Sequence, residues 1–133
     1  QAAFLNFKLA SFPETIKRRR EIALIYDEML RNKRDIILPP GPNEESKNFD
    51  TYQNYEIQLN KRNELKNFLK ENGVGTIIQW GGWMLHQFEK LSLKANAPYA
   101  EEMSKRMLLL PMNHMLLDEE VRYICNLILS NKY

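Results

Sequence analysis

The sequence predicts an α+β fold: a two-layer small domain with a short, mainly antiparallel sheet, helices on one face of that sheet, and a long, broken linker helix in front. Two observations support this prediction. First, segments in which apolar residues have helical spacing alternate along the chain with short apolar segments. Second, residues 52–59 show the two-residue period of a strand with one buried face. Strands of that kind form small sheets that helices cover on one side.

The N-terminal part begins with two helices. The first covers residues 2–9, and the second begins at Ser11 and ends near residues 31–33. Ser11 and Glu14 have the spacing of a capping box, in which Pro13 is tolerated in the first turn. The apolar stripe of the second helix consists of Ile22, Ile25 and Met29.

Two strands are expected next, on either side of a loop. Residues 36–38 form a short apolar strand, which ends at the prolines of residues 39–42 because proline donates no ladder hydrogen bond. Residues 41–49 are polar and rich in turn formers, which predicts an exposed loop. The strand over residues 52–59 follows, and its inward positions are Tyr55, Ile57 and Leu59.

A helix over residues 61–72 ends at Gly73 and precedes a further strand over residues 74–80. The sequence of residues 81–98 indicates a turn and a short irregular helix around residues 86–91. The inward positions of the helix before Gly73 are Leu65, Phe68 and Leu69.

The remaining sequence predicts a helix over residues 99–106 and a strand over residues 108–110, which ends at Pro111. A closing helix is expected over residues 118–131. The single cysteine excludes an internal disulfide and is interpreted as a small core residue instead of a nucleophile. It belongs to the inner face of the closing helix, which consists of Val121, Ile124, Cys125 and Ile128.

Composition excludes several classes of function. The 133 residues suit one globular domain, and the net charge of +2 is too small to indicate a nucleic-acid partner. The dense basic run Arg18–Arg20 is interpreted as a solvated helix face. No apolar run reaches the about 20 residues that span a bilayer, and no signal peptide is recognisable. We therefore expect a cytoplasmic protein without a membrane or nucleic-acid partner.

The chain opens inside a helical pattern, with no capping residue before Ala2. We therefore expect sequence upstream of it. Residues 1–34 would then be linker helices that lead from a missing large domain into a small domain over residues 35–133. An exposed apolar patch at Phe4, Leu5 and Phe7 should mark the surface that the large domain covers.

The most unusual segment of the chain is GTIIQWGGW, residues 75–83, which combines two tryptophans with a pair of glycines. A strand that ends there places backbone amides and an aromatic surface at a sheet end, where Trp80 or Trp83 stacks on a sugar or a base. The alternative interpretation is that both tryptophans pack in the core and the glycines only turn the chain. The candidate contact residues of this segment are Gln79, Trp80, Gly81 and Gly82.

Other polar residues give weaker signals. His86 is a candidate donor at a site, although a lone histidine beside apolar neighbours is more often a structural one. The sequence shows no metal-ligand cluster and no spacing of serine, histidine and acid that favours a triad. Its lysines lie in polar helical patterns, where nothing would desolvate them for imine chemistry. The chain alone therefore shows no catalytic residue.

Five stretches, which cover nearly all of the chain in order, carry a resemblance. They read QAAFLNFKL, KRRREIALIYDEML, TYQNYEIQL, RNELKNFLKENGVGT and PYAEEMSKRMLLLPMNHMLLDEEVRYICNLI. Together they resemble the last third of the sugar aminotransferases of the DegT/DnrJ/StrS family, which have the aspartate aminotransferase fold, fold type I. The first stretch is similar to the family's passage from the large to the small domain, so this chain looks like the C-terminal small domain.

The resemblance implies an enzyme whose other half lies upstream. In the family, the lysine that forms the Schiff base with pyridoxal phosphate precedes the QAAFL helix, as do the acid at the pyridine nitrogen and most of the phosphate cup. The full-length parent would bind pyridoxal phosphate, whereas this fragment alone would bind none and be inactive. The parent would transfer an amino group, with glutamate as donor, to a nucleotide-linked keto-deoxysugar, and it would form a homodimer.

Two departures from the family's pattern are informative. Where the family reads histidine, tyrosine, a variable residue and proline, this chain has Gln79 to Gly82, and the strings IIQWGG, HQFE and YQNYEI resemble the branch that aminates nucleotide-linked 3-keto-6-deoxyhexoses. Leu117 stands where the family caps its last helix with serine or threonine, so Asp118 is expected to cap instead. Contacts to the sugar or the cofactor edge are implied for Gln79, Trp80, Gly81, Gly82 and His86, with Tyr52 and Asn54 as second choices.

Two alternatives remain open at this point. Some members of the family dehydrate keto sugars and carry histidine in place of the Schiff-base lysine, and that position is absent from this chain. The second alternative is a non-enzymatic α+β binding module, which the lack of a complete site favours.

Overall fold

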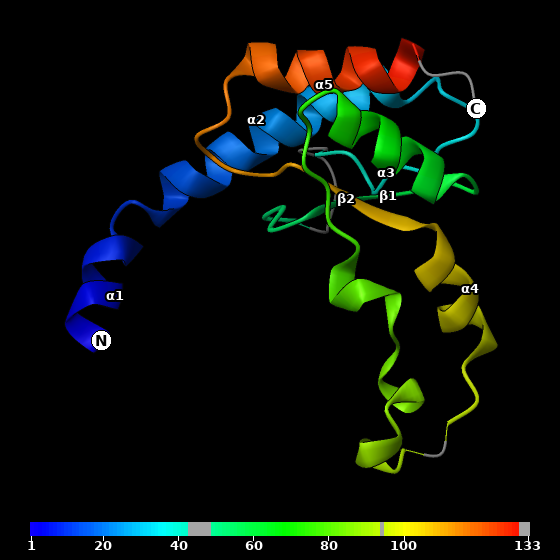
Figure 1. The fold of residues 1–133 in the computed structure, drawn as a ribbon. Coiled ribbons are helices and arrows are strands. Elements are labelled where there is room, and N and C mark those ends of the chain that lie inside the picture. Colours follow the sequence, from blue (N-terminus) through cyan, green and yellow to red (C-terminus); the bar gives the residue numbers. More distant parts are fainter. Residues whose placement is uncertain (43–48, 94, 131–133) are drawn as a thin grey trace.

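The structure, a computed structural model, describes residues 1–42, 49–93 and 95–130. It confirms the predicted α+β class, and Figure 1 shows the arrangement of the elements. The helices are α1 (Ala2–Leu9), α2 (Phe12–Leu30), α3 (Arg62–Glu71), α4 (Pro98–Arg106) and α5 (Asp118–Ser130). The strands are β1 (Tyr55–Gln58) and β2 (Met107–Leu110), and the 3-10 turns are η1 (Gln79–Gly82), η2 (Leu85–Gln87) and η3 (Glu89–Leu91).

The sheet is antiparallel, as predicted, but smaller than the sequence suggested. Strands β1 and β2 pair along their whole length. Two further segments each join the sheet through one residue, since Ile37 bridges to β1 and Ile77 bridges to β2. The strands predicted over residues 36–38 and 74–80 are therefore wrong, because each reduces to a single bridge.

Backbone conformation explains the shorter strands. The bridge at Ile37 is followed within two residues by Pro39, which cannot extend a ladder. Trp80 takes a φ of 55°, in the left-handed region that a strand cannot use. Tyr52 likewise has a φ of 47°, so the strand predicted over residues 52–59 begins only at Tyr55.

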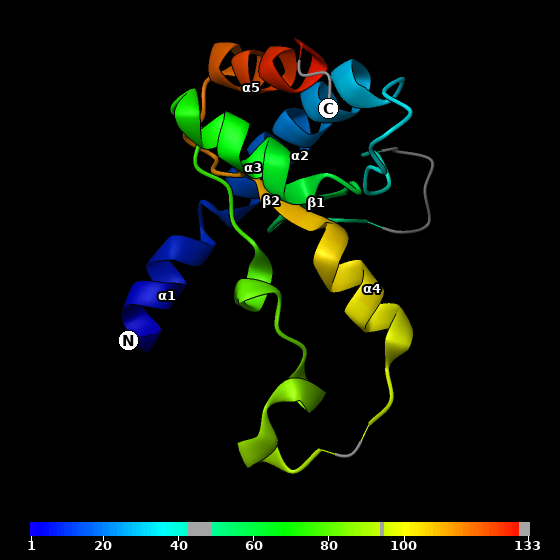
Figure 2. The same ribbon diagram turned by 45° about the vertical axis from the view of Figure 1, so that its right-hand side comes forward.

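Helices α2, α3 and α5 lie together on one side of the sheet in both ribbon views (Figures 1 and 2). Their apolar faces and the inward side chains of the strands form one core, whose burial is the main favourable contribution to folding. Near its centre, Tyr26 is fully buried, its ring centroid lies 4.8 Å from that of Tyr55, and its hydroxyl donates a 2.9 Å hydrogen bond to the carbonyl of Pro111. The buried residues include the predicted Ile22, Ile25, Leu65, Leu69, Val121, Ile124, Cys125 and Ile128.

Two helix boundaries test the predicted signals. The hydroxyl of Ser11 donates to the carbonyl of Lys8 and makes no cap bond to α2, so the capping box with Glu14 is wrong. The sequence does break between two helices there, as expected. At the end of α3, Gly73 has a φ of 79°, which confirms it as the residue that stops this helix.

The start of α5 also differs from its predicted cap. Asp118 lies inside the first turn, and the carboxylate of Glu120 instead accepts a hydrogen bond from the backbone N–H of Leu117. The Asp118 carboxylate is 2.7 Å from the guanidinium of Arg18, which also donates to the carbonyl of Leu116. All three arginines of the basic run are half-buried, so this face of α2 is only partly solvated, and Arg18 joins α2 to α5.

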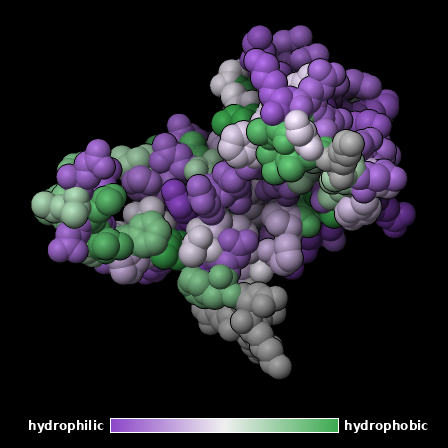
Figure 3. All heavy atoms as spheres, turned by 90° about the horizontal axis from the view of Figure 1, so that it is seen from below, coloured by the Kyte–Doolittle hydropathy of each residue, from purple (hydrophilic) through white to green (hydrophobic). Residues whose placement is uncertain are grey.

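Helix α1 projects from the body of the molecule, and none of its residues is buried. Phe4, Leu5 and Phe7 are 62%, 61% and 80% exposed, which confirms the predicted apolar patch. Figure 3, which views the molecule from below, shows apolar side chains gathered at the left-hand end, the side on which α1 lies in Figure 1. The role of residues 1–34 as a linker between domains stays a prediction.

A second projection, here called the arm, comprises residues 79–97 and returns to the sheet through α4 (Figures 1 and 2). None of its described residues is buried. The irregular helix predicted around residues 86–91 is present as the two short turns η2 and η3. Among the described residues, no helix has both the length and the apolar character to cross a membrane.

Candidate functional site

A cavity of about 230 Å³ lies where the arm leaves the sheet, and it is here called the arm-base pocket. It is lined by β1, η1, α4 and β2, so residues far apart in the sequence meet in it. Three of the residues predicted from the sequence, Gln79, Trp80 and Gly82, are among them. The full lining consists of Glu56, Ile78, Gln79, Trp80, Gly82, Met84, Ser104 and Met107.

The backbone of η1 turns sharply beside this pocket. Trp80, Gly81 and Gly82 have φ values of 55°, 66° and 83°. Glycine adopts such angles freely, whereas a tryptophan there carries a conformational cost of about 1–3 kcal/mol, which is found mostly at functional sites. Trp80 is 77% exposed and Trp83 is 56% exposed, so the alternative interpretation, in which both tryptophans pack in the core, is wrong.

The polar residue that the sequence did not single out is Glu56 on β1. Its neighbours Tyr55 and Ile57 are fully buried on the core face, so Glu56 lies on the opposite face and lines the arm-base pocket. It is half-buried, and burial raises the pKa of its carboxyl. The alternation of residues in this strand had indicated only that position 56 faces away from the core.

His86 does not line the arm-base pocket. Its Nε2 lies 2.8 Å from Oε1 of Glu101, and its side chain is 13% exposed. This contact fastens η2 to α4 and so holds the two sides of the arm together. In this structure His86 therefore stabilises the arm and does not line the arm-base pocket.

The two second-choice residues lie elsewhere. Tyr52 is 1% exposed, and its hydroxyl donates a 2.6 Å hydrogen bond to the carbonyl of Pro40, so its side chain is part of the core. Asn54 is exposed and lines a separate cavity of about 130 Å³ beside Gly75 and Pro111. The structure brings neither residue to the arm-base pocket.

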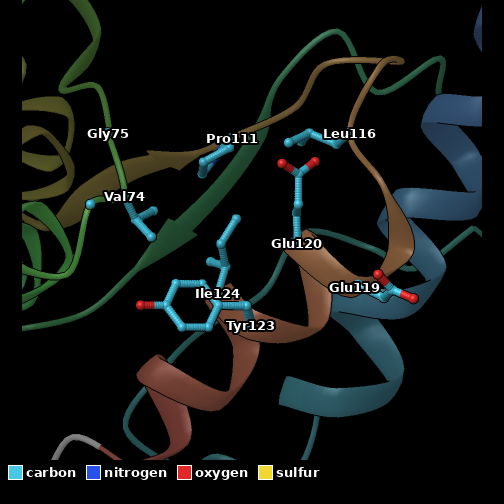
Figure 4. Close-up of a pocket in the computed structure, with 9 residues that line it drawn as sticks. Val74, Gly75, Pro111, Leu116, Glu119, Glu120, Tyr123 and Ile124 are labelled. Carbon is cyan, nitrogen blue, oxygen red and sulfur yellow. The ribbon is translucent and has the colours of Figure 1, made fainter.

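A larger cavity of about 460 Å³ lies at the start of α5. Figure 4 shows that Glu120 points toward Pro111 and Leu116, whereas Glu119 points away from them. The Glu120 carboxylate already accepts a hydrogen bond from the backbone N–H of Leu117, so it stabilises the N-terminal end of α5. None of the residues predicted for a site lies in this cavity.

The described part of the chain does not assemble nucleophilic or metal chemistry. Cys125 is fully buried, and burial raises the pKa of its thiol to about 12, so it is inert as a nucleophile. No lysine in the described ranges is buried, and no group of three metal-ligating side chains comes together there. The lining of the arm-base pocket is instead suited to binding a ligand, because Glu56 and Gln79 offer hydrogen-bond acceptors and Trp80 offers an aromatic surface.

Comparisons with known proteins agree on one family. The sequence model of the DegT/DnrJ/EryC1/StrS aminotransferase family matches residues 1–129. The dTDP-4-dehydro-2,3,6-trideoxy-D-glucose 4-aminotransferase of Saccharopolyspora spinosa is 32% identical over 127 residues, which cover 94% of this chain and 32% of that protein. The pleiotropic regulatory protein of Geobacillus stearothermophilus is 31% identical over 128 residues, which cover 93% of this chain and 34% of that protein.

A solved structure shows the same fold. The aminotransferase TlmJ from Streptoalloteichus hindustanus matches with a TM-score of 0.83 and 26% identity, over 92% of this chain and 33% of that one. The chain thus spans about a third of the length of the relatives it matches.

Proposed function

Since the chain belongs to the DegT/DnrJ/EryC1/StrS aminotransferase family, we propose that it is the C-terminal part of an aminotransferase that acts on a nucleotide-linked keto-deoxysugar. The observation that carries this proposal is the family match over residues 1–129, together with 32% identity to a relative named as a sugar-nucleotide aminotransferase. The proposal includes glutamate as the amino donor and a cytoplasmic, homodimeric parent enzyme.

Pyridoxal phosphate is the cofactor that the family implies, and the described residues do not fit it by themselves. The cofactor needs a lysine that forms an imine and donors for its phosphate. Among the described residues, neither lysine nor arginine lines the arm-base pocket. We propose that the remaining two thirds of the parent supply the lysine and the phosphate donors, and that this chain lines the sugar side of the site through Gln79, Trp80 and Gly82.

The position of the keto group in the substrate is the finer part of the proposal. The strings IIQWGG and YQNYEI resemble the branch that aminates 3-keto-6-deoxyhexoses, whereas the Saccharopolyspora relative is named for a 4-dehydro sugar. We propose a 3-keto-6-deoxyhexose. Turnover of the complete enzyme with matched 3-keto and 4-keto sugar nucleotides tests this, because preference for the 4-keto sugar contradicts the assignment.

The chain alone is expected to form no Schiff base with pyridoxal phosphate. No lysine in residues 1–42, 49–93 and 95–130 is buried, so these ranges offer no apolar site of the kind that favours an imine-forming lysine. The measurement is an absorbance titration of the chain with the cofactor, with free lysine as the control for nonspecific imines. A saturable Schiff-base band that disappears when one lysine of the chain is replaced by alanine would contradict the prediction.

The complete protein provides the decisive assay. Purified with its upstream sequence, it should bind pyridoxal phosphate through one lysine and transfer an amino group from glutamate to the keto sugar. Histidine at that lysine position together with sugar dehydration would identify a dehydratase instead. Absence of cofactor binding by the complete protein would favour a non-enzymatic binding module.

A further inference from the structure

The carboxylate of Glu56 differs from three other carboxylates of the folded body, because each of those contacts a basic side chain. The Glu101 carboxylate contacts His86, that of Asp27 pairs with Arg31, and that of Asp118 pairs with Arg18. The Glu56 carboxylate makes no hydrogen bond or ion pair with any described residue, although the side chain is half-buried in the arm-base pocket.

This arrangement is unfavourable for folding. A carboxylate that loses water without gaining a partner destabilises the folded state, and burial accordingly raises the pKa of Glu56. Groups kept in such surroundings are commonly ones that meet a ligand. The ligand must then supply hydrogen-bond donors.

The other lining residues narrow the chemistry of that ligand. Trp80 offers an exposed aromatic face in a strained backbone conformation, and Gln79 adds an amide that donates and accepts. None of the described lining residues is basic, and the guanidinium of Arg62 donates to the carbonyls of Ser104 and Met107. A phosphate or a uronate carboxylate in the cavity would therefore face the like charge of Glu56 with no basic side chain among these lining residues. A volume of about 230 Å³ is below the about 300–1,000 Å³ of sites for drug-sized ligands, so it suits one ring.

We propose that Glu56 accepts hydrogen bonds from the hydroxyl groups of a neutral hexopyranose ring that stacks on Trp80, and that it thereby selects neutral sugars over uronates. The identity of the ring as the sugar of a nucleotide-linked substrate rests on the proposed function. Three observations are independent of it: the carboxylate without a partner among the described residues, the cavity, and the exposed aromatic ring.

Binding to the chain itself tests this inference without any amino transfer. Backbone amide resonances of the labelled chain are followed by NMR during titration with dTDP-glucose, with dTDP alone and with dTDP-glucuronate. We expect dTDP-glucose to shift the amides of residues 79–82 saturably and the other two probes to leave them unchanged. Glu56→Gln should weaken the binding of dTDP-glucose about tenfold or more, which corresponds to about 1.4 kcal/mol.

The matched control is Glu28→Gln, which removes an exposed carboxylate from α2, away from the pocket, and should leave binding unchanged. The thermal midpoint gives a second readout. Because the folded state holds the proton of Glu56 more tightly than the unfolded state does, stability falls as the pH rises from the pKa of the unfolded-state carboxyl through the raised pKa of the folded state. The loss is complete above the raised pKa. Glu56→Gln should therefore raise the thermal midpoint at neutral pH.

Several results would overturn the inference. They are equal shifts with dTDP alone, equal affinity for the glucuronate, no saturable shift at millimolar dTDP-glucose, unchanged affinity in Glu56→Gln, or a lower thermal midpoint in that variant. Sugar binding by the chain in a complete protein that transfers no amino group would contradict only the proposed function.

Discussion

Replacement of Tyr26 by alanine is expected to lower the free energy of unfolding by about 3–5 kcal/mol, the range for removal of a buried aromatic side chain. Tyr26 is fully buried between α2 and the sheet and stacks on Tyr55. A loss of that size is a large share of the about 5–15 kcal/mol that stabilises a typical domain. Urea denaturation followed by circular dichroism measures it.

Two conservative variants separate the ring from its hydroxyl. Tyr26→Phe should cost about 0.5–1.5 kcal/mol, because it removes the hydrogen bond to the Pro111 carbonyl. Tyr55→Phe should be neutral or stabilising, because the buried hydroxyl of Tyr55 has no partner among the described residues. Equal losses in these two phenylalanine variants would contradict this account of the core.

Replacement of Gly82 by leucine in the complete enzyme is expected to reduce sugar-nucleotide turnover by more than tenfold. A Cβ at position 82 would lie 3.6 Å from Cγ2 of Ile78 and 3.8 Å from the carbonyl oxygen of Ser104, which are ordinary contacts. Both neighbours line the arm-base pocket, so the rest of the leucine side chain would enter the space proposed for the sugar. Turnover efficiency and the thermal midpoint are measured on the same preparations.

Gly73→Leu is the matched control for backbone strain. Gly73 and Gly82 have φ values of 79° and 83°, so leucine should cost each variant about 1–2 kcal/mol of stability. A Cβ on Gly73 would meet nothing within 4 Å, and that residue is outside the arm-base pocket. Gln79→Ala should reduce turnover mildly, since one neutral hydrogen bond contributes about 0.5–1.5 kcal/mol. If activity falls only as far as stability does in all three variants, the pocket is scaffold.

The helices were predictable from the sequence because their signals are local. Apolar spacing located α2, α3, α4 and α5 to within a few residues, and Gly73 marked the end of α3. The strands were predicted too long because apolar character does not report the φ angle of one residue. Tyr52 and Trp80 both take left-handed angles, and each prevents a strand from extending through it.

The candidate site was predictable only in part. The glycine pair and the tryptophans drew attention to residues 79–83, and three of those residues line the pocket. Glu56 comes from a strand more than twenty positions away, and its polar side chain looked like any solvent-facing position of an alternating strand. Only the fold shows that η1 and α4 cover that face of β1, and only the contacts show that His86 pairs with Glu101 instead.

The single-residue bridges at the two sides of the sheet also limit how this protein aggregates. An exposed edge strand is a template on which another chain adds a strand, and its reach depends on a run of free backbone donors and acceptors. At one side, Ile37 uses its N–H and carbonyl on Gln58 and is soon followed by Pro39 and Pro40. At the other side, the chain turns away three residues after Ile77. Both borders are therefore too short to be a good template for a further strand from a neighbouring chain, so we expect this small sheet to resist fibrous growth.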